Sequence, residues 1–228
     1  MDEQFDNSGS LDDLFTDPSL GDVPSYIGSD IRNLRIKVTS RGYDDIGKVL
    51  TSLQIKFTPF NNRLDDCDIL FVNCASFYEI TNIDEFKQFI IGGGIVYISD
   101  LSSDLIDIAF PGVMRFEKSG NPCQLNARIL DYDLANRMGN TISVNFDMGA
   151  WSKIKQLNRG EIILQDVASN MPLMVYFPEG HGKVYYTSFH NHAQLTSHEE
   201  KLLQLLIVKQ VSQRVSKPFN SVAKSFGI

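Results

Sequence analysis

The sequence is poor in the residues that build disulfide frameworks and zinc sites. It has 3 cysteines and 4 histidines in 228 residues, and Cys67, Cys74 and Cys123 are widely spaced with no CxxC pair. An odd number of isolated cysteines argues against a disulfide framework or a zinc knuckle, and it is typical of reducing surroundings. We therefore expect a cytoplasmic protein.

Long apolar runs and a leader pattern are also missing. The longest apolar runs fall far short of the roughly 18–20 residues that cross a bilayer. The first residues contain neither a basic region nor an apolar stretch, so we expect no secretory signal. The sequence thus predicts no membrane partner.

Basic side chains are absent from the first thirty residues. Residues 1–30 hold eight of the 28 acidic side chains and none of the 21 basic ones, although the net charge of the whole chain is only −7. The rest of the chain is therefore close to neutral. A neutral body without a basic face argues against a nucleic-acid partner. Because Gly, Ser, Asp and Pro dominate residues 1–30, we predict a disordered acidic arm there.

One patch of this arm combines acidic and bulky apolar side chains. It reads Leu11-Asp12-Asp13-Leu14-Phe15. Such a patch can fold on a partner protein as a short helix, with Leu11, Leu14 and Phe15 on one face. The alternative is a solvated tail without a partner.

The body that follows alternates strand and helix patterns. Strands separated by helical stretches predict crossover connections and a parallel sheet. The continuous apolar run within Asp68–Asn73 is typical of a strand buried on both faces. The predicted strands are 35–39, 54–58, 68–73 and 95–99, and the predicted helices are about 44–53 and 83–91, with Asp44 and Thr81 as N-caps.

The second half of the body has a different pattern. Residues 104–140 look helical and loop-like. Two β-rich runs around a glycine-containing loop predict a hairpin, and a Ser197–Glu200 capping box begins the last helix. The further predicted strands are 141–146 and 161–165, the hairpin strands are 171–177 and 183–189, and the last helix is about 197–211. The domain so predicted covers 31–214, and 215–228 is expected to be a loose tail.

All four histidines fall within eighteen residues. His190 and His192 are separated by one residue, so on an extended segment their side chains point the same way. Two imidazoles and a carboxylate could hold a metal ion, and Asp100 or Asp104, which both follow the fourth predicted strand, would supply the carboxylate from the binding crevice. No HExxH motif supports this site. The alternative is that both histidines bond to backbone groups in the turn before the final helix.

The sequence contains no strong motif for a catalytic nucleophile. Cys74 ends the third predicted strand, but it lacks the small-residue elbow and has only His190 as a possible base, so we expect a buried structural thiol. Ser102 and Ser103 follow the fourth strand at the elbow position, yet no glycines surround them.

Two segments resemble the class I glutamine amidotransferase-like superfamily. Residues 86–99, FKQFIIGGGIVYIS, are similar to its helix–glycine–strand passage. Residues 180–194, GHGKVYYTSFHNHAQ, are similar to its closing hairpin, especially in the trehalose-utilisation (ThuA-like) branch. The resemblance covers about 33–212. It implies an α/β fold, a flavodoxin-like three-layer sandwich with a mostly parallel central sheet and a C-terminal antiparallel hairpin.

The resemblance also implies that the catalytic triad is degenerate. Catalytic members use Cys, His and Glu, with the Cys in the elbow after the strand that matches 95–99. Here the elbow begins at Asp100 and contains no cysteine; His190 matches the His, but His192 stands where Glu is expected. The crevice expected to bind a ligand is formed by Asp100, Ser102, Ser103, His190 and His192.

We therefore predict a non-catalytic module that docks a partner protein or a small ligand and needs no cofactor. One alternative is a carbohydrate-acting or metal-assisted hydrolase that uses His190, His192 and Asp100. Another is a structural component of a larger assembly, tethered by the acidic arm.

Overall fold

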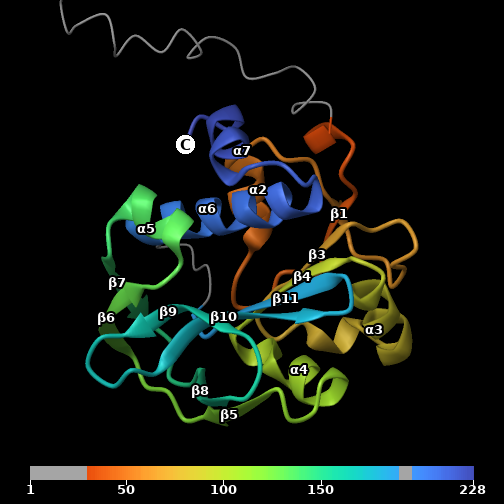
Figure 1. Ribbon diagram of the computed structural model, residues 1–228. Coiled ribbons are helices and arrows are strands. Elements are labelled where there is room, and N and C mark those ends of the chain that lie inside the picture. The colour runs from red at the N-terminus through yellow and green to blue at the C-terminus, as the bar shows by residue number, and fades with distance from the viewer. Residues whose placement is uncertain (1–29, 190–196) are drawn as a thin grey trace, which may run out of the picture.

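The computed structural model describes residues 30–189 and 197–228, and a nine-stranded sheet runs through it (Figure 1). Five neighbouring strands are parallel. The first four follow the order 2-1-3-4 and β11 adds the fifth, which is the flavodoxin-like order. The predicted fold class is confirmed. The parallel strands are, in spatial order, β2 (Thr58–Pro59), β1 (Ile36–Val38), β3 (Ile69–Val72), β4 (Ile95–Ser99) and β11 (Gly182–Thr187).

The parallel strands form where the apolar runs are continuous. Every residue of β3 and β4 is buried, as expected for strands covered on both faces. The strand predicted at 54–58 is shorter, and only Thr58–Pro59 pairs with β1. The reason is local, because Gln54 adopts φ +57° and the Ile55 N–H bonds back to the carbonyl of Leu50 in the preceding helix.

The other four strands are antiparallel. The predicted hairpin is present as β10 (Pro172–Glu179) and β11, and β10 continues through β9 (Glu161–Asp166) to β6 (Cys123–Ile129) and β7 (Thr141–Phe146). A separate two-stranded sheet pairs β5 (Met114–Lys118) with β8 (Ser152–Leu157). The prediction that residues 104–140 are helical and loop-like is wrong for β5 and β6.

Helices cover both faces of the large sheet. One face carries α2 (Ile46–Ser52), α5 (Tyr132–Met138), α6 (Ser197–Arg214) and α7 (Phe219–Ser225), and the other carries α3 (Ile83–Ile91), α4 (Asp104–Ala109) and the β5–β8 sheet (Figure 1). Two short 3₁₀ turns follow β3 and β4, at Phe77–Glu79 and Asp100–Ser103.

Three local predictions need correction. Asp45, not Asp44, caps α2 by accepting the Gly47 N–H, and Asn82, not Thr81, caps α3 by accepting the Glu85 N–H. The tail expected to be loose contains α7, which buries Phe219 among the core residues of the α6 face. An apolar face on this short helix anchors it to α6.

Candidate functional site

Buried polar side chains gather where the parallel strands end. Ligands of open α/β sheets bind at this carboxyl edge, and here the loops after β1, β3 and β4 meet. The side chains are each less than 5 % exposed. We call the following set the carboxyl-edge network: Thr39, Asp44, Asn73, Cys74, Ser76, Ser99, Asp100 and Ser102.

Asp100 is the first residue after β4 and adopts φ +36°, a rare backbone conformation for a residue other than glycine. A sharp strained turn at this position is the geometry of a nucleophile elbow. The Asp100 side chain is 0 % exposed. Its Oδ1 accepts the Ser152 N–H at 2.7 Å, and its Oδ2 lies 3.7 Å from Cys74 Sγ. The backbone at Asp100 therefore has the geometry of a nucleophile elbow. Its side chain, however, is buried and hydrogen-bonded within the protein.

Asp44 is the second buried carboxylate of the network. Its Oδ1 accepts the Cys74 N–H at 2.6 Å, and its Oδ2 accepts the Ser99 hydroxyl at 2.5 Å. These bonds tie the loop after β1 to the ends of β3 and β4. The Asp44 carboxylate is therefore occupied by groups at the ends of β3 and β4. The side chain of Asp45, the next residue, caps α2 instead.

The Cys74 thiol lies between the two carboxylates. Burial raises its pKa well above the usual range, and the charges of Asp100 and Asp44 raise it further. A hydrogen bond from the Leu101 N–H acts in the opposite direction but does not offset them. The thiol stays protonated at neutral pH and is a poor nucleophile, in keeping with the prediction of a structural cysteine.

Ser102 and Ser103 are both 0 % exposed. The Ser102 hydroxyl donates to the Asn73 carbonyl at 2.7 Å and accepts the Ser76 N–H at 3.1 Å. The Ser103 hydroxyl donates to Ser152 Oγ at 3.0 Å. Asp100, Ser102 and Ser103 lie in one 3₁₀ turn and are held in internal hydrogen bonds, and the ligand-binding crevice that they were expected to form stays a prediction.

The other predicted site residues cannot be compared with the structure. His190 and His192, the expected second wall of the crevice and the alternative metal ligands, lie outside the described residues, as does the arm segment with Leu11, Leu14 and Phe15. Within residues 30–189 and 197–228, no three His, Cys, Asp or Glu side chains are grouped to hold a metal ion. None of the helices in those ranges is both long and apolar enough to span a membrane.

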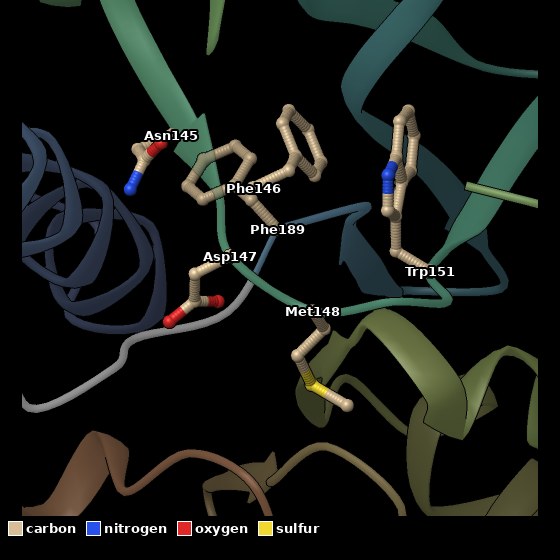
Figure 2. Close-up of a pocket in the computed structure, with 6 residues that line it drawn as sticks. All are labelled: Asn145, Phe146, Asp147, Met148, Trp151 and Phe189. Atoms are coloured by element: carbon tan, nitrogen blue, oxygen red, sulfur yellow. The ribbon is translucent and has the colours of Figure 1, made fainter. Parts of the chain in front are cut away.

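A shallow aromatic hollow lies beside the network. Figure 2 shows Phe146, Phe189 and Trp151 around it, with Asp147 and Met148 on the connecting loop. The Phe146 ring stacks on Trp151 with centroids 4.0 Å apart, and Phe189 meets Phe146 edge-on at 6.4 Å. The rings leave about 10 Å³ of space between them, roughly what one water molecule needs.

The sequence did not reveal these aromatic residues as neighbours of the site. Phe146 ends an alternating strand and Phe189 ends the hairpin, and nothing in their spacing links them to Trp151. Trp151 precedes Ser152, whose N–H binds Asp100, so the β7–β8 connection carries both the aromatic wall and a partner of the elbow residue. Only the pairing of distant strands brings them together.

No protein-family model matches the sequence, and no curated protein matches it. Solved structures do match. A protein from Thermoplasma acidophilum, described as a GMP synthase subunit, has a TM-score of 0.59 at 15% identity, covering 80% of this chain and 94% of that one. A ThuA-like protein from Bacteroides uniformis has a TM-score of 0.55 at 9% identity, covering 78% and 91%. A glutamine amidotransferase from Thermotoga maritima has a TM-score of 0.52 at 8% identity, covering 85% and 90%.

Identities this low show the fold alone. The chain has the class I glutamine amidotransferase-like fold, as the resemblance in its sequence implied.

Proposed function

Starting from an amidotransferase-like fold whose elbow is occupied internally, we propose that this protein is a non-catalytic module that binds a partner protein or a small ligand. One observation supports it above the rest. The elbow residue is a fully buried Asp100, whose carboxylate accepts the Ser152 N–H and lies within reach of the Cys74 thiol.

The chemistry of the elbow supports the same proposal. Acyl transfer needs an activated nucleophile and donors that stabilise the developing oxyanion. In an elbow, one such donor is the backbone N–H of the residue after the nucleophile. Here that residue is Leu101, whose N–H lowers the pKa of the Cys74 thiol without offsetting burial. The side chain at the elbow is thus a carboxylate engaged with Ser152, where acyl transfer would need an activated nucleophile.

Turnover measurements on the full chain test the catalytic half of this proposal. We expect no ammonia release from glutamine and no hydrolysis of a p-nitrophenyl ester above the buffer rate. Cys74→Ser and His190→Ala should leave that background unchanged. Robust turnover that His190→Ala abolishes, in a variant whose thermal unfolding matches the wild type, would overturn the proposal.

Binding of a partner is tested through the arm. Partner capture by the full chain should be lost when Leu11, Leu14 and Phe15 are replaced together by Ser, because those side chains form the apolar face of the predicted docking helix. Leu20→Ser is the matched control, since it removes an apolar side chain of the same arm outside the patch. Equal loss in the control, or unchanged capture in the triple variant, contradicts docking through the patch.

A further inference from the structure

The antiparallel half of the large sheet ends at β7, which is the last strand of that sheet in the described part of the chain. The strand lies at the margin of the molecule beside α5 (Figure 1). It is six residues long and pairs with β6 in one unbroken register. Its sequence, TISVNF, contains no charged residue, proline or glycine. Edge strands usually carry charges, prolines or bulges that prevent pairing with another chain, and β7 has none of these.

The opposite edge of the same sheet is protected. It is formed by β2, which is only two residues long. One of the two is Pro59, which has no N–H group to offer to another strand. The sheet therefore has one edge that resists further pairing and one that does not.

The backbone groups of β7 point alternately toward β6 and away from it. The Ile129 N–H donates to the Asn140 carbonyl at 2.9 Å, so Asn140 and the even-numbered residues of β7 face β6. The N–H and carbonyl groups of the odd-numbered residues, Thr141, Ser143 and Asn145, therefore point outward. They form the row to which another strand could bond.

The far end of this row is already occupied. Glu199, in the first turn of α6, is 4 % exposed and accepts the Asn145 N–H at 2.6 Å. Within residues 30–189 and 197–228, the outward groups of Thr141 and Ser143 have no such partner. The carboxylate of Glu199 therefore confines an added strand to the stretch around Thr141 and Ser143.

We propose that β7 pairs with β7 of a second copy of this chain, antiparallel and about a two-fold axis at Ile142. An antiparallel pair of identical strands is self-complementary, because a two-fold axis gives both copies the same contacts. Thr141 then lies opposite Ser143 of the second copy, and each of the two symmetry-related pairs exchanges both of its N–H···O bonds. A register centred on Ser143 would need the Asn145 N–H, which Glu199 already holds.

The side chains favour the same pairing. Ile142 is 6 % exposed and belongs to the core on the α6 face, and the axis would place it beside its counterpart. Thr141 and Ser143 lie on the other face, where a Thr opposite a Ser can hydrogen-bond across the strands. An interface this short buries less than the roughly 1,200 Å² of a stable complex, so we expect a weak dimer. This inference concerns self-association and does not depend on whether the elbow is catalytic.

Sedimentation equilibrium of the full chain at several concentrations tests the pairing. We expect the wild type to show a reversible monomer–dimer equilibrium. Combining Thr141→Lys with Ser143→Lys places lysine opposite lysine on both sides of the axis, which should raise the dimer Kd by at least about tenfold. The matched control combines Gln124→Lys with Asn126→Lys, which adds the same charge at exposed positions of β6, inside the sheet. The control should keep the wild-type Kd, and thermal unfolding checks that both variants are folded.

A mixing experiment identifies the occupant and the register. A variant with Thr141→Glu and Ser143→Glu should also dimerise weakly alone but should form a heterodimer with the lysine variant, because Lys and Glu then face each other. No heterodimer in the mixture, or a lysine variant that dimerises as well as the control, would overturn the proposal. A wild type that stays monomeric at every concentration would also overturn it and would leave the edge to a strand of another protein.

Discussion

The two halves of the large sheet bury their strands differently. In the parallel half, β3 and β4 are buried at every residue, and α-helices cover both faces. In the antiparallel half, β6 and β7 alternate between exposed and buried residues. Polar groups at the carboxyl edge of the parallel half are buried, so they need hydrogen-bond partners within the protein. The exposed polar side chains of β6 and β7 can hydrogen-bond to water instead. The same side chain should therefore contribute very differently to stability in the two halves.

An identical substitution in each half gives the largest expected contrast. Asn73 is 0 % exposed; its Oδ1 accepts the Ile46 N–H and its Nδ2 donates to the Thr39 carbonyl, both at 3.0 Å. Asn73→Ala leaves both partners buried and unpaired, which should lower the free energy of unfolding by about 3 kcal/mol. Asn126→Ala, on the exposed face of β6, should lower it by less than about 0.5 kcal/mol. If urea unfolding shows equal losses of unfolding free energy in the two variants, the expected difference between the two halves is wrong.

A second contrast concerns a charged group at the opposite edge of the parallel half. Asp68, just before β3, is buried, which by itself would raise its pKa. Hydrogen bonds from Arg35 and Arg214 outweigh burial and hold the pKa at about 2. The unfolded value is about 3.9, so the ionised pair contributes stability that is complete above pH 4 and is lost as pH falls through 2.

Asp68→Asn removes that titration. We expect the variant to be about 2 kcal/mol less stable at pH 7 and to lose less stability than the wild type between pH 4 and pH 2. Urea unfolding at several pH values measures both. If the unfolding free energies of wild type and variant change with pH in the same way, the ionised Asp68 carboxylate does not contribute the expected stability.

The smallest expected change is an increase in the free energy of unfolding. It concerns α6, which packs against both halves. Gln210 is 0 % exposed, and no described group hydrogen-bonds to its amide. Gln210→Met keeps the shape of the side chain and removes the polar atoms, so it should raise the free energy of unfolding by about 1 kcal/mol. The control on the same helix is Gln213→Met, since Gln213 Oε1 accepts the Tyr185 hydroxyl at 2.6 Å. That variant should lose about 1 kcal/mol, and a loss of similar size at Gln210 would contradict the explanation.

How well the sequence predicts structure also differs between the halves. The continuous apolar runs at β3 and β4 predicted buried parallel strands, because no exposed strand tolerates such a run. The strand β6 was missed, although Ala127 and Ile129 are buried while Gln124 and Asn126 are exposed. The strand β6 pairs with β7 and β9. A half-buried strand is stabilised largely by packing against such neighbours, which a local sequence pattern does not show.

The candidate site was predicted in part. The sequence placed the elbow within 100–103, with Ser102 and Ser103 as its candidate nucleophiles, and the structure puts the positive φ at Asp100. Its engagement with Ser152 could not be foreseen, because Ser152 lies 52 residues away in a strand of the other sheet. Asp44 was assigned to a local cap for the same reason, since its partners at Cys74 and Ser99 are distant in sequence.

Local patterns in the chain were enough to set the parallel strands, the closing hairpin, the missing elbow cysteine and the separate acidic segment. Each depends on residue types read over a few neighbouring positions. Tertiary structure alone decided that the polar side chains at the carboxyl edge bond to one another and that aromatic rings pack beside them. Those arrangements depend on which distant strands and helices pair, and on the need of every buried polar group for a hydrogen-bond partner.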